Sequence, residues 1–146
     1  MAKETYVSYG DQETKQIAAD LIDSLSTGTV ICLEGVMAAG KTTFSQGVGV
    51  ALNIPRVVSP TYMIMREYDI ENHKVFKRLF HLYLYRLNTA EEIKAFDLEE
   101  IWSQSENLIL VEWPEKFFEL LPKNRVEVQI KVNSGTEREI TINKPH

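Results

Sequence analysis

The sequence contains a single cysteine, Cys32, among its 146 residues, and it has no long apolar run. One cysteine excludes an internal disulfide and any metal site built from several thiolates. No apolar stretch approaches the length of a membrane span, and the first residues lack the apolar segment of a secretory signal. We therefore expect a cytoplasmic protein that does not enter a membrane.

The sequence also lacks an excess of positive charge. Lysine and arginine together number 16 against 21 acidic residues, which gives a formal net charge of -5. This balance argues against a broad surface for binding nucleic acid or lipid headgroups. The apolar share of 44% is ordinary for a globular protein, and no repeat, low-complexity tract or linker divides the chain. We expect a single domain over residues 1–146.

One stretch has a pattern with a known chemical use. An apolar segment, Val30 to Leu33, is followed by Gly35-Val36-Met37-Ala38-Ala39-Gly40-Lys41-Thr42 and then by a segment with helical spacing. A Gly-x-x-x-x-Gly-Lys-Thr loop between a buried strand and a helix is the P-loop, or Walker A, pattern. The glycines let the backbone N–H groups converge on phosphate oxygens, and the start of the helix adds a positive field. This stretch predicts nucleotide binding.

The side chains of this loop have distinct expected roles. Lys41 can reach the β- and γ-phosphates, and the Thr42 hydroxyl can bind Mg²⁺. We therefore predict ATP or ADP together with Mg²⁺ as ligands. The predicted nucleotide contacts within this stretch are Gly35, Met37, Ala38, Ala39, Gly40, Lys41, Thr42 and Thr43.

A second informative stretch runs from Asn107 to Glu115. Four apolar residues, 108–111, are followed directly by Glu112, as in a buried parallel strand that ends in an acid. In P-loop proteins, an acid at the end of a strand beside the P-loop strand holds Mg²⁺ or its water. Glu112 is therefore the candidate for a second metal-binding side chain, and Pro114 is expected to open a short helix that ends at Leu121.

The remaining segments predict an α/β fold. A short edge strand over 5–9, a helix that starts near Asp11 as its N-cap and ends before Gly28, and a helix that ends at 53–55 surround the P-loop strand. Segments 62–68 and 75–86 are expected to form a hairpin, as are 126–132 and 137–142. A helical pattern runs from Thr89 toward Trp102. We expect a P-loop NTPase-like domain whose mostly parallel central sheet is flanked by helices and extended by antiparallel hairpins.

These motifs resemble those of the TsaE family, formerly YjeE, and the resemblance covers nearly the whole chain. Members are small bacterial ATPases needed to make threonylcarbamoyl-adenosine in tRNA. The motifs occur in the family's order: the P-loop at 35–44, Ser-Pro-Thr-Tyr at 59–62, His81 with Leu-Tyr-Arg-Leu at 84–87, and Leu-Val-Glu-Trp-Pro-Glu at 110–115. The second and fourth of these are far more specific than a P-loop alone.

The resemblance implies further roles. Glu112 corresponds to a Walker B-like metal acid, Ser59 and Thr61 to a switch-like loop near the γ-phosphate, and Thr14 to the border of the adenine site. The implied partners are the TsaB and TsaD proteins, and tRNA is engaged only indirectly, since TsaD performs the transfer. Lys41 and Glu112 are then the candidate catalytic residues.

The sequence departs from the family pattern at three positions. Val36 and Ala38 replace Asp and Gly in the P-loop, and Tyr83 replaces the Asp of the strand motif. That Asp is the group best suited to orient the attacking water or to support Mg²⁺, and a neutral phenol is neither a base nor a hard ligand. Position 83 is therefore a candidate catalytic position at which turnover is in question, with Glu67 or Asp69 on the adjoining strand as substitutes.

Three functions remain open on the sequence. The first is a Mg²⁺-dependent ATPase that supports modification of tRNA. The second is a catalytically weak, nucleotide-binding regulatory subunit. The third is a small-molecule P-loop kinase, which would need an acceptor pocket and an arginine-rich lid, and the sequence has no segment of that kind.

Overall fold

The structure is a computed structural model that describes residues 2–36, 39–57, 65–85, 87, 89–94, 97–115 and 117–145. Within these ranges, seven strands form one sheet in the order β1-β7-β6-β2-β5-β4-β3. The strands are β1 (Ala2–Ser8), β2 (Thr29–Glu34), β3 (Met65–Asp69), β4 (Arg78–Tyr83), β5 (Asn107–Glu112), β6 (Val126–Ser134) and β7 (Glu137–Lys144). The helices are α1 (Asp11–Asp23), α2 (Lys41–Ala51), α3 (Ala90–Lys94), α4 (Leu98–Trp102) and the 3-10 helix η1 (Phe118–Leu120).

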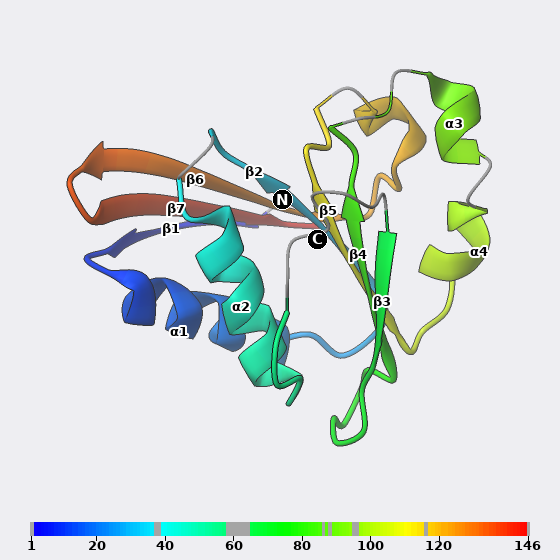
Figure 1. The fold of residues 1–146 in the computed structure, drawn as a ribbon, viewed down its shortest axis with the longest axis horizontal. Coiled ribbons are helices and arrows are strands. Elements are labelled where there is room, and N and C mark those ends of the chain that lie inside the picture. Colours follow the sequence, from blue (N-terminus) through cyan, green and yellow to red (C-terminus); the bar gives the residue numbers. More distant parts are fainter. Residues whose placement is uncertain are drawn as a thin grey trace.

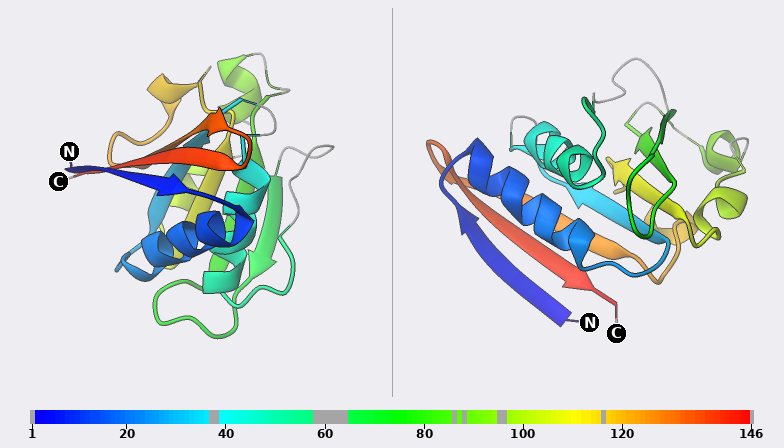
Figure 2. Two further views of the ribbon diagram at one scale, coloured as in Figure 1. Left: turned by 90° about the vertical axis from the view of Figure 1, so that its left-hand side faces the viewer. Right: turned by 90° about the horizontal axis from the view of Figure 1, so that it is seen from below.

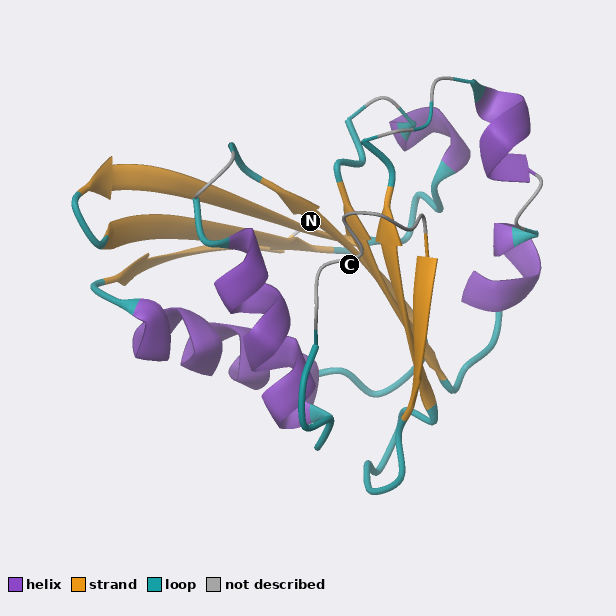
Figure 3. Ribbon diagram, in the orientation of Figure 1, coloured by secondary structure: helices purple, strands orange, loops and turns teal. Residues whose placement is uncertain are grey.

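The centre of the sheet is parallel and its two margins are antiparallel. Strand β2 lies between β5 and β6 and is parallel to both, and β4 is parallel to β5. On the margins, β3 pairs antiparallel with β4, β7 with β6, and β1 with β7. Figure 3 shows these strands in orange as one twisted sheet with helices on both sides. The predicted fold class is confirmed.

Each face of the sheet has its own apolar core. Helices α1 and α2 lie together on one face, and the short helices α3 and α4 lie on the other (Figure 1). In β2, Ile31 and Leu33 belong to the core beneath α1 and α2, while Val30 and Cys32 belong to the core that includes α3 and α4. A strand covered on both faces needs an uninterrupted apolar run. Burial raises the pKa of Cys32 to about 12, which keeps its thiol protonated and unreactive.

The C-terminal hairpin extends the central sheet. Strands β6 and β7 pair as predicted, and β6 also aligns parallel with β2, where Ile31 lies opposite Val126. The edge strand β1 then pairs along β7, so that Ala2 lies opposite Lys144 and the two ends of the chain are neighbours (Figure 2). The hairpin was predicted from its turn, but its place beside the P-loop strand was not.

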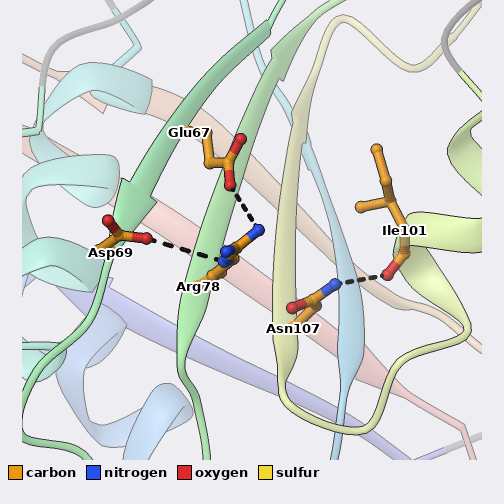
Figure 4. A network of polar contacts seen from close by, with 5 residues as sticks. All are labelled: Glu67, Asp69, Arg78, Ile101 and Asn107. Atoms are coloured by element: carbon orange, nitrogen blue, oxygen red, sulfur yellow. Dashed lines mark hydrogen bonds and ion pairs between the residues drawn. The ribbon is translucent and has the colours of Figure 1, made fainter.

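The other predicted hairpin, β3–β4, is confirmed in its antiparallel pairing, although β4 is shorter than the predicted 75–86. Arg78 at the start of β4 contacts Glu67 at 3.0 Å and Asp69 at 3.7 Å, both on β3 (Figure 4). On the next strand, the side-chain amide of Asn107 donates a hydrogen bond of 2.8 Å to the carbonyl of Ile101 in α4. These contacts fix the amino-terminal ends of β4 and β5. The first part of the segment predicted as 62–68 lies outside the described residues.

Several helix boundaries differ from the predictions. Asp11 is the first residue of α1, not its N-cap, and Gly10 takes the capping position with an extended backbone. The helix expected toward Trp102 is two short helices, because Asp97 has a φ of 51°, in the left-handed region, which ends a right-handed helix. After Pro114 the chain forms only the 3-10 helix η1. None of the helices within the described ranges is long and apolar enough to span a bilayer.

Candidate nucleotide site

The predicted strand–loop–helix unit is present. Strand β2 ends at Glu34, and α2 begins at Lys41 after a turn in which the Ala39 N–H donates to the Val36 carbonyl at 3.1 Å. Gly40, just before the helix, has a φ of 111°, which residues with a side chain rarely adopt. At Gly35, a Cβ would lie 2.9 Å from the Ile130 carbonyl, so the close approach of β6 requires glycine there.

Lys41 is buried, and the described part of the chain offers its ammonium no hydrogen-bond acceptor. Its relative exposure is 7%, and its Nζ has no hydrogen-bond partner among the described residues. The ammonium group lies over the Trp113 ring, 3.6 Å from the ring centre. Burial lowers the pKa of Lys41 from its ordinary value, while the charges of Glu112 and Glu115 act in the opposite direction. A buried cation without an acceptor is suited to an anionic ligand.

The start of α2 offers further groups for phosphate. The Phe44 N–H donates a hydrogen bond of 2.9 Å to the Gly40 carbonyl near the start of α2. The backbone amides of residues 41–43 precede this hydrogen bond, and the first amides of a helix have no acceptor within the helix. The Thr42 side chain is exposed and that of Thr43 is half-buried. Exposure leaves the Thr42 hydroxyl accessible to a metal ion, whereas Lys41 points into the protein.

Glu112 lies at the end of β5, between the P-loop strand and β4. It is paired in register with Leu33 of β2 on one side and with Tyr83 of β4 on the other. Its exposure is 2%, and the Leu84 N–H donates to its backbone carbonyl at 3.0 Å. The sequence prediction that an acid ends the strand next to the P-loop strand is confirmed. Its role in holding a metal remains a prediction.

Tyr83 lies directly beside Glu112. The alternation of β4 places His81 and Tyr83 on one face, as predicted, and both are buried. Tyr85 follows the end of the strand, and the residue is 53% exposed. Its ring centre lies 6.1 Å from that of Tyr83 and 5.0 Å from that of Trp113. The structure therefore puts a phenol at the position next to Glu112 where the family pattern has a carboxylate.

The suggestion that Glu67 or Asp69 replaces that carboxylate is wrong. Both pair with Arg78 at the opposite end of β4 from Tyr83. Strand β3 alternates so that Tyr68 packs against the core beneath α1 and α2, which puts Glu67 and Asp69 on the other face of the sheet. The hairpin register thus separates these acids from Glu112 both along the strand and across the sheet.

His81 was predicted to lie on the same face as Tyr83 but was given no role. Its Nε2 lies 2.5 Å from Glu112 Oε2, and the exposures of the two side chains are 0% and 3%. Its Nδ1 is buried and has no hydrogen-bond partner among the described residues. The spacing of the strand motif indicated the face on which His81 lies. It did not indicate the contact, because the partner Glu112 is 31 residues away along the chain.

The other predicted contacts have mixed outcomes. Thr14 lies in the first turn of α1, where its buried hydroxyl is 2.7 Å from the Ser8 hydroxyl. This hydrogen bond occupies the side chain that was expected to border the adenine, and the expectation remains a prediction. Met37, Ala38, Ser59 and Thr61 lie outside the described residues.

Sequence analysis missed Arg138 and Trp113. From β7, Arg138 Nε donates to the Ala39 carbonyl at 3.0 Å, and its Nη1 donates to the Gly135 carbonyl at 2.7 Å. An arginine on a distant hairpin therefore supports the P-loop, and no local pattern indicates this. Trp113 has a φ of 59°, a backbone conformation that is costly for residues other than glycine. In this conformation its ring lies against the Lys41 ammonium.

An open cleft of about 750 Å³ borders the P-loop on the side of Trp113. Gly35 and Val36 line one part, Tyr85 and Trp113 another, and Glu34 contributes a carboxylate. Burial raises the pKa of Glu34, and the charges of neighbouring Glu115 and Glu127 raise it further. The cleft combines aromatic surface with acidic groups next to the predicted phosphate-binding loop.

The fold and the loop geometry define a P-loop NTPase-like α/β protein. Comparison with known proteins supports a narrower assignment, because the family model "Threonylcarbamoyl adenosine biosynthesis protein TsaE" matches residues 9–140. The chain belongs to the TsaE family.

Individual relatives agree with this assignment. The chain is 39% identical over 131 residues to the tRNA threonylcarbamoyladenosine biosynthesis protein TsaE of Bacillus subtilis, which covers 89% of this chain and 78% of the relative. It is 35% identical to the protein of the same name from Borreliella burgdorferi, over 70% of this chain and 72% of that protein. The crystal structure of Bacillus subtilis YdiB superposes with a TM-score of 0.79 at 31% identity, covering 98% of this chain and 86% of that one.

Proposed function

We propose that this protein binds ATP and ADP with Mg²⁺ at the P-loop and hydrolyses ATP in support of threonylcarbamoyl-adenosine synthesis in tRNA. The observation that carries the proposal is the buried ammonium of Lys41, which has no hydrogen-bond acceptor among the described residues and lies at the start of α2. A triphosphate would supply the missing acceptor and meet the amides of the same helix end.

The donor groups of the site fit a magnesium ion. The Thr42 hydroxyl and the Glu112 carboxylate are the hard oxygen ligands that Mg²⁺ prefers, and Mg²⁺ keeps several waters in such sites. Bound Mg²⁺ would neutralise charge that develops on the phosphates. Lys41 would hold the phosphates, and Arg138 would keep the P-loop carbonyl of Ala39 in place.

Isothermal titration with ADP and with a non-hydrolysable ATP analogue, each with Mg²⁺ and with EDTA, tests this proposal. Lys41→Ala should weaken binding of the triphosphate by at least about tenfold, the loss expected for one charge-assisted contact. Lys94→Ala, on the short helix α3, is the matched control and should bind as the unaltered protein does. Equal affinity of a folded Lys41→Ala variant would refute the site.

A nucleotide-binding subunit with little turnover is the second candidate, and Tyr83 favours it. The Tyr83 side chain is buried beside Glu112. Because it ends in a phenol, this position does not provide the carboxylate that would orient water. Phosphate release by the protein alone and with its partners separates the two candidates.

The family assignment supports partnership with TsaB and TsaD. We propose that the P-loop protein binds a complex of these proteins in a nucleotide-dependent manner and engages tRNA only through that complex. Affinity capture with TsaB and TsaD from the same organism, repeated with ADP, ATP analogue and no nucleotide, tests this. Absence of binding in every nucleotide state would contradict the partnership.

A further inference from the structure

We propose that His81 is a positioning residue for Glu112, holding its carboxylate in one orientation. The inference rests on the proposed Mg²⁺–nucleotide site. His81 and Glu112 are a diagonal pair on neighbouring parallel strands, since His81 lies opposite Leu110 and Glu112 follows two residues later. Side chains at such positions share a face and are within reach of each other.

Burial makes this contact important for Glu112. Both side chains are almost entirely inaccessible to water, and Nε2 lies 2.5 Å from Oε2. An ionised carboxylate in such a place needs donors to replace its lost hydration. An N–H from the His81 ring supplies one, and because the ring stands on a strand in the core, it restricts the directions that the carboxylate can adopt.

The contact bears on the proposed metal site, because a carboxylate that is already held in one direction loses less freedom when it binds an ion. Groups that orient metal ligands typically contribute about 10- to 100-fold to metal affinity.

The binding test compares His81→Leu, which removes the donor, with His81→Gln, whose side-chain amide can still donate. For each variant, the dissociation constant of the ATP analogue is measured with Mg²⁺ and with EDTA. We expect His81→Leu to lose about tenfold or more of the tightening that Mg²⁺ produces, with little change in EDTA, and His81→Gln to recover most of it. His73→Asn, in the β3–β4 turn, is the matched control and should behave as the unaltered protein does.

A second measurement keeps the proposal testable if His81→Leu fails to fold. Long-range proton–nitrogen NMR of the unaltered protein reports which ring nitrogen carries the proton, and the spectrum of His81→Gln identifies the His81 signals by their loss. We expect a proton on Nε2, the nitrogen that faces Glu112. A ring that carries its proton on Nδ1 alone would overturn the proposal.

The outcomes separate this inference from the proposed function. If the unaltered protein tightens on nucleotide with Mg²⁺ and folded His81→Leu tightens equally, the role of His81 is wrong and the nucleotide site stands. If the unaltered protein binds no nucleotide, the proposed function fails and the role of His81 fails with it. A loss that is the same in EDTA and in Mg²⁺, and is not recovered by His81→Gln, would show that His81 is merely structural.

Discussion

The ammonium nitrogen of Lys41 lies 3.6 Å from the centre of the Trp113 ring. The two residues come from different elements, the start of α2 and the turn after β5. A cation over the face of an indole ring is stabilised by the ring quadrupole, and the interaction is stronger when both groups are shielded from water. The P-loop lysine thus has an alternative partner where no nucleotide is bound.

Nucleotide binding should therefore change the fluorescence of Trp113. Phosphate oxygens are better acceptors for Lys41 than an aromatic ring, so the ammonium should leave the indole. The measurement is emission during titration with ADP in a Trp102→Phe background, which leaves Trp113 as the sole tryptophan of the two in the sequence. Adding Lys41→Met should change the emission without nucleotide and remove most of the response. Unchanged emission at saturating ADP would contradict this prediction.

The affinity for triphosphate should fall at alkaline pH, beginning below the ordinary lysine value of 10.5. Burial lowers the pKa of Lys41, so the free protein loses the ammonium as the pH rises through this lowered value, and the ammonium is the form that binds phosphate. The dissociation constant of the ATP analogue, measured from pH 7 upward, should show the loss in the unaltered protein and not in Lys41→Met.

The lowered pKa of Lys41 should affect folding stability in the opposite direction, so that stability rises with pH where triphosphate affinity falls. A lysine whose pKa is lower in the folded state binds fewer protons there than in the unfolded chain. Between the lowered pKa and 10.5, Lys41 should therefore make the free energy of unfolding rise with pH. Denaturant unfolding of the unaltered protein and of Lys41→Met across this range isolates the contribution, and identical slopes would argue against a buried ammonium.

Replacing Glu112 with Gln should reduce the effect of Mg²⁺ on nucleotide binding. The substitution keeps the size of the side chain and a carbonyl oxygen that can accept from His81, while it removes the charge that attracts the metal. We expect the gain in affinity from Mg²⁺ to fall by about tenfold, equivalent to roughly 1.4 kcal/mol. Glu115→Gln, an exposed acid in the following turn, is the control and should keep the full gain. Equal Mg²⁺ dependence in Glu112→Gln would exclude Glu112 as a metal-binding residue.

Tyr83→Asp should raise turnover more than it raises affinity. Tyr83 lies next to Glu112, so an aspartate there would add a second carboxylate where water and Mg²⁺ are expected. A group that orients or deprotonates water acts mainly in the transition state, and we expect at least about a tenfold gain in the single-turnover rate. Tyr83→Phe should give no gain. If the unaltered protein already hydrolyses ATP as fast as Tyr83→Asp, position 83 does not limit turnover.

The sequence by itself determined the parts of this protein whose chemistry is local. The P-loop is recognisable because glycine at positions 35 and 40, and lysine at 41, are required within one short turn between a strand and a helix. Glu112 could be predicted for a related reason, since an acid that ends a fully buried strand is visible as a break in an apolar run. The same local signals gave the two hairpins and the mostly parallel class of the sheet.

Only the tertiary structure decided which distant side chains meet. Glu67 and Asp69 are close to Tyr83 in the predicted hairpin. The register of β3 and β4 instead places both acids toward the far end of β4 and on the other face, where each forms an ion pair with Arg78. Strand pairing likewise brings His81 to Glu112, and the position of β6 and β7 beside β2 lets Arg138 reach the P-loop. A shift of one residue in a strand reverses the face of every side chain, and nothing in a short stretch of sequence fixes that register.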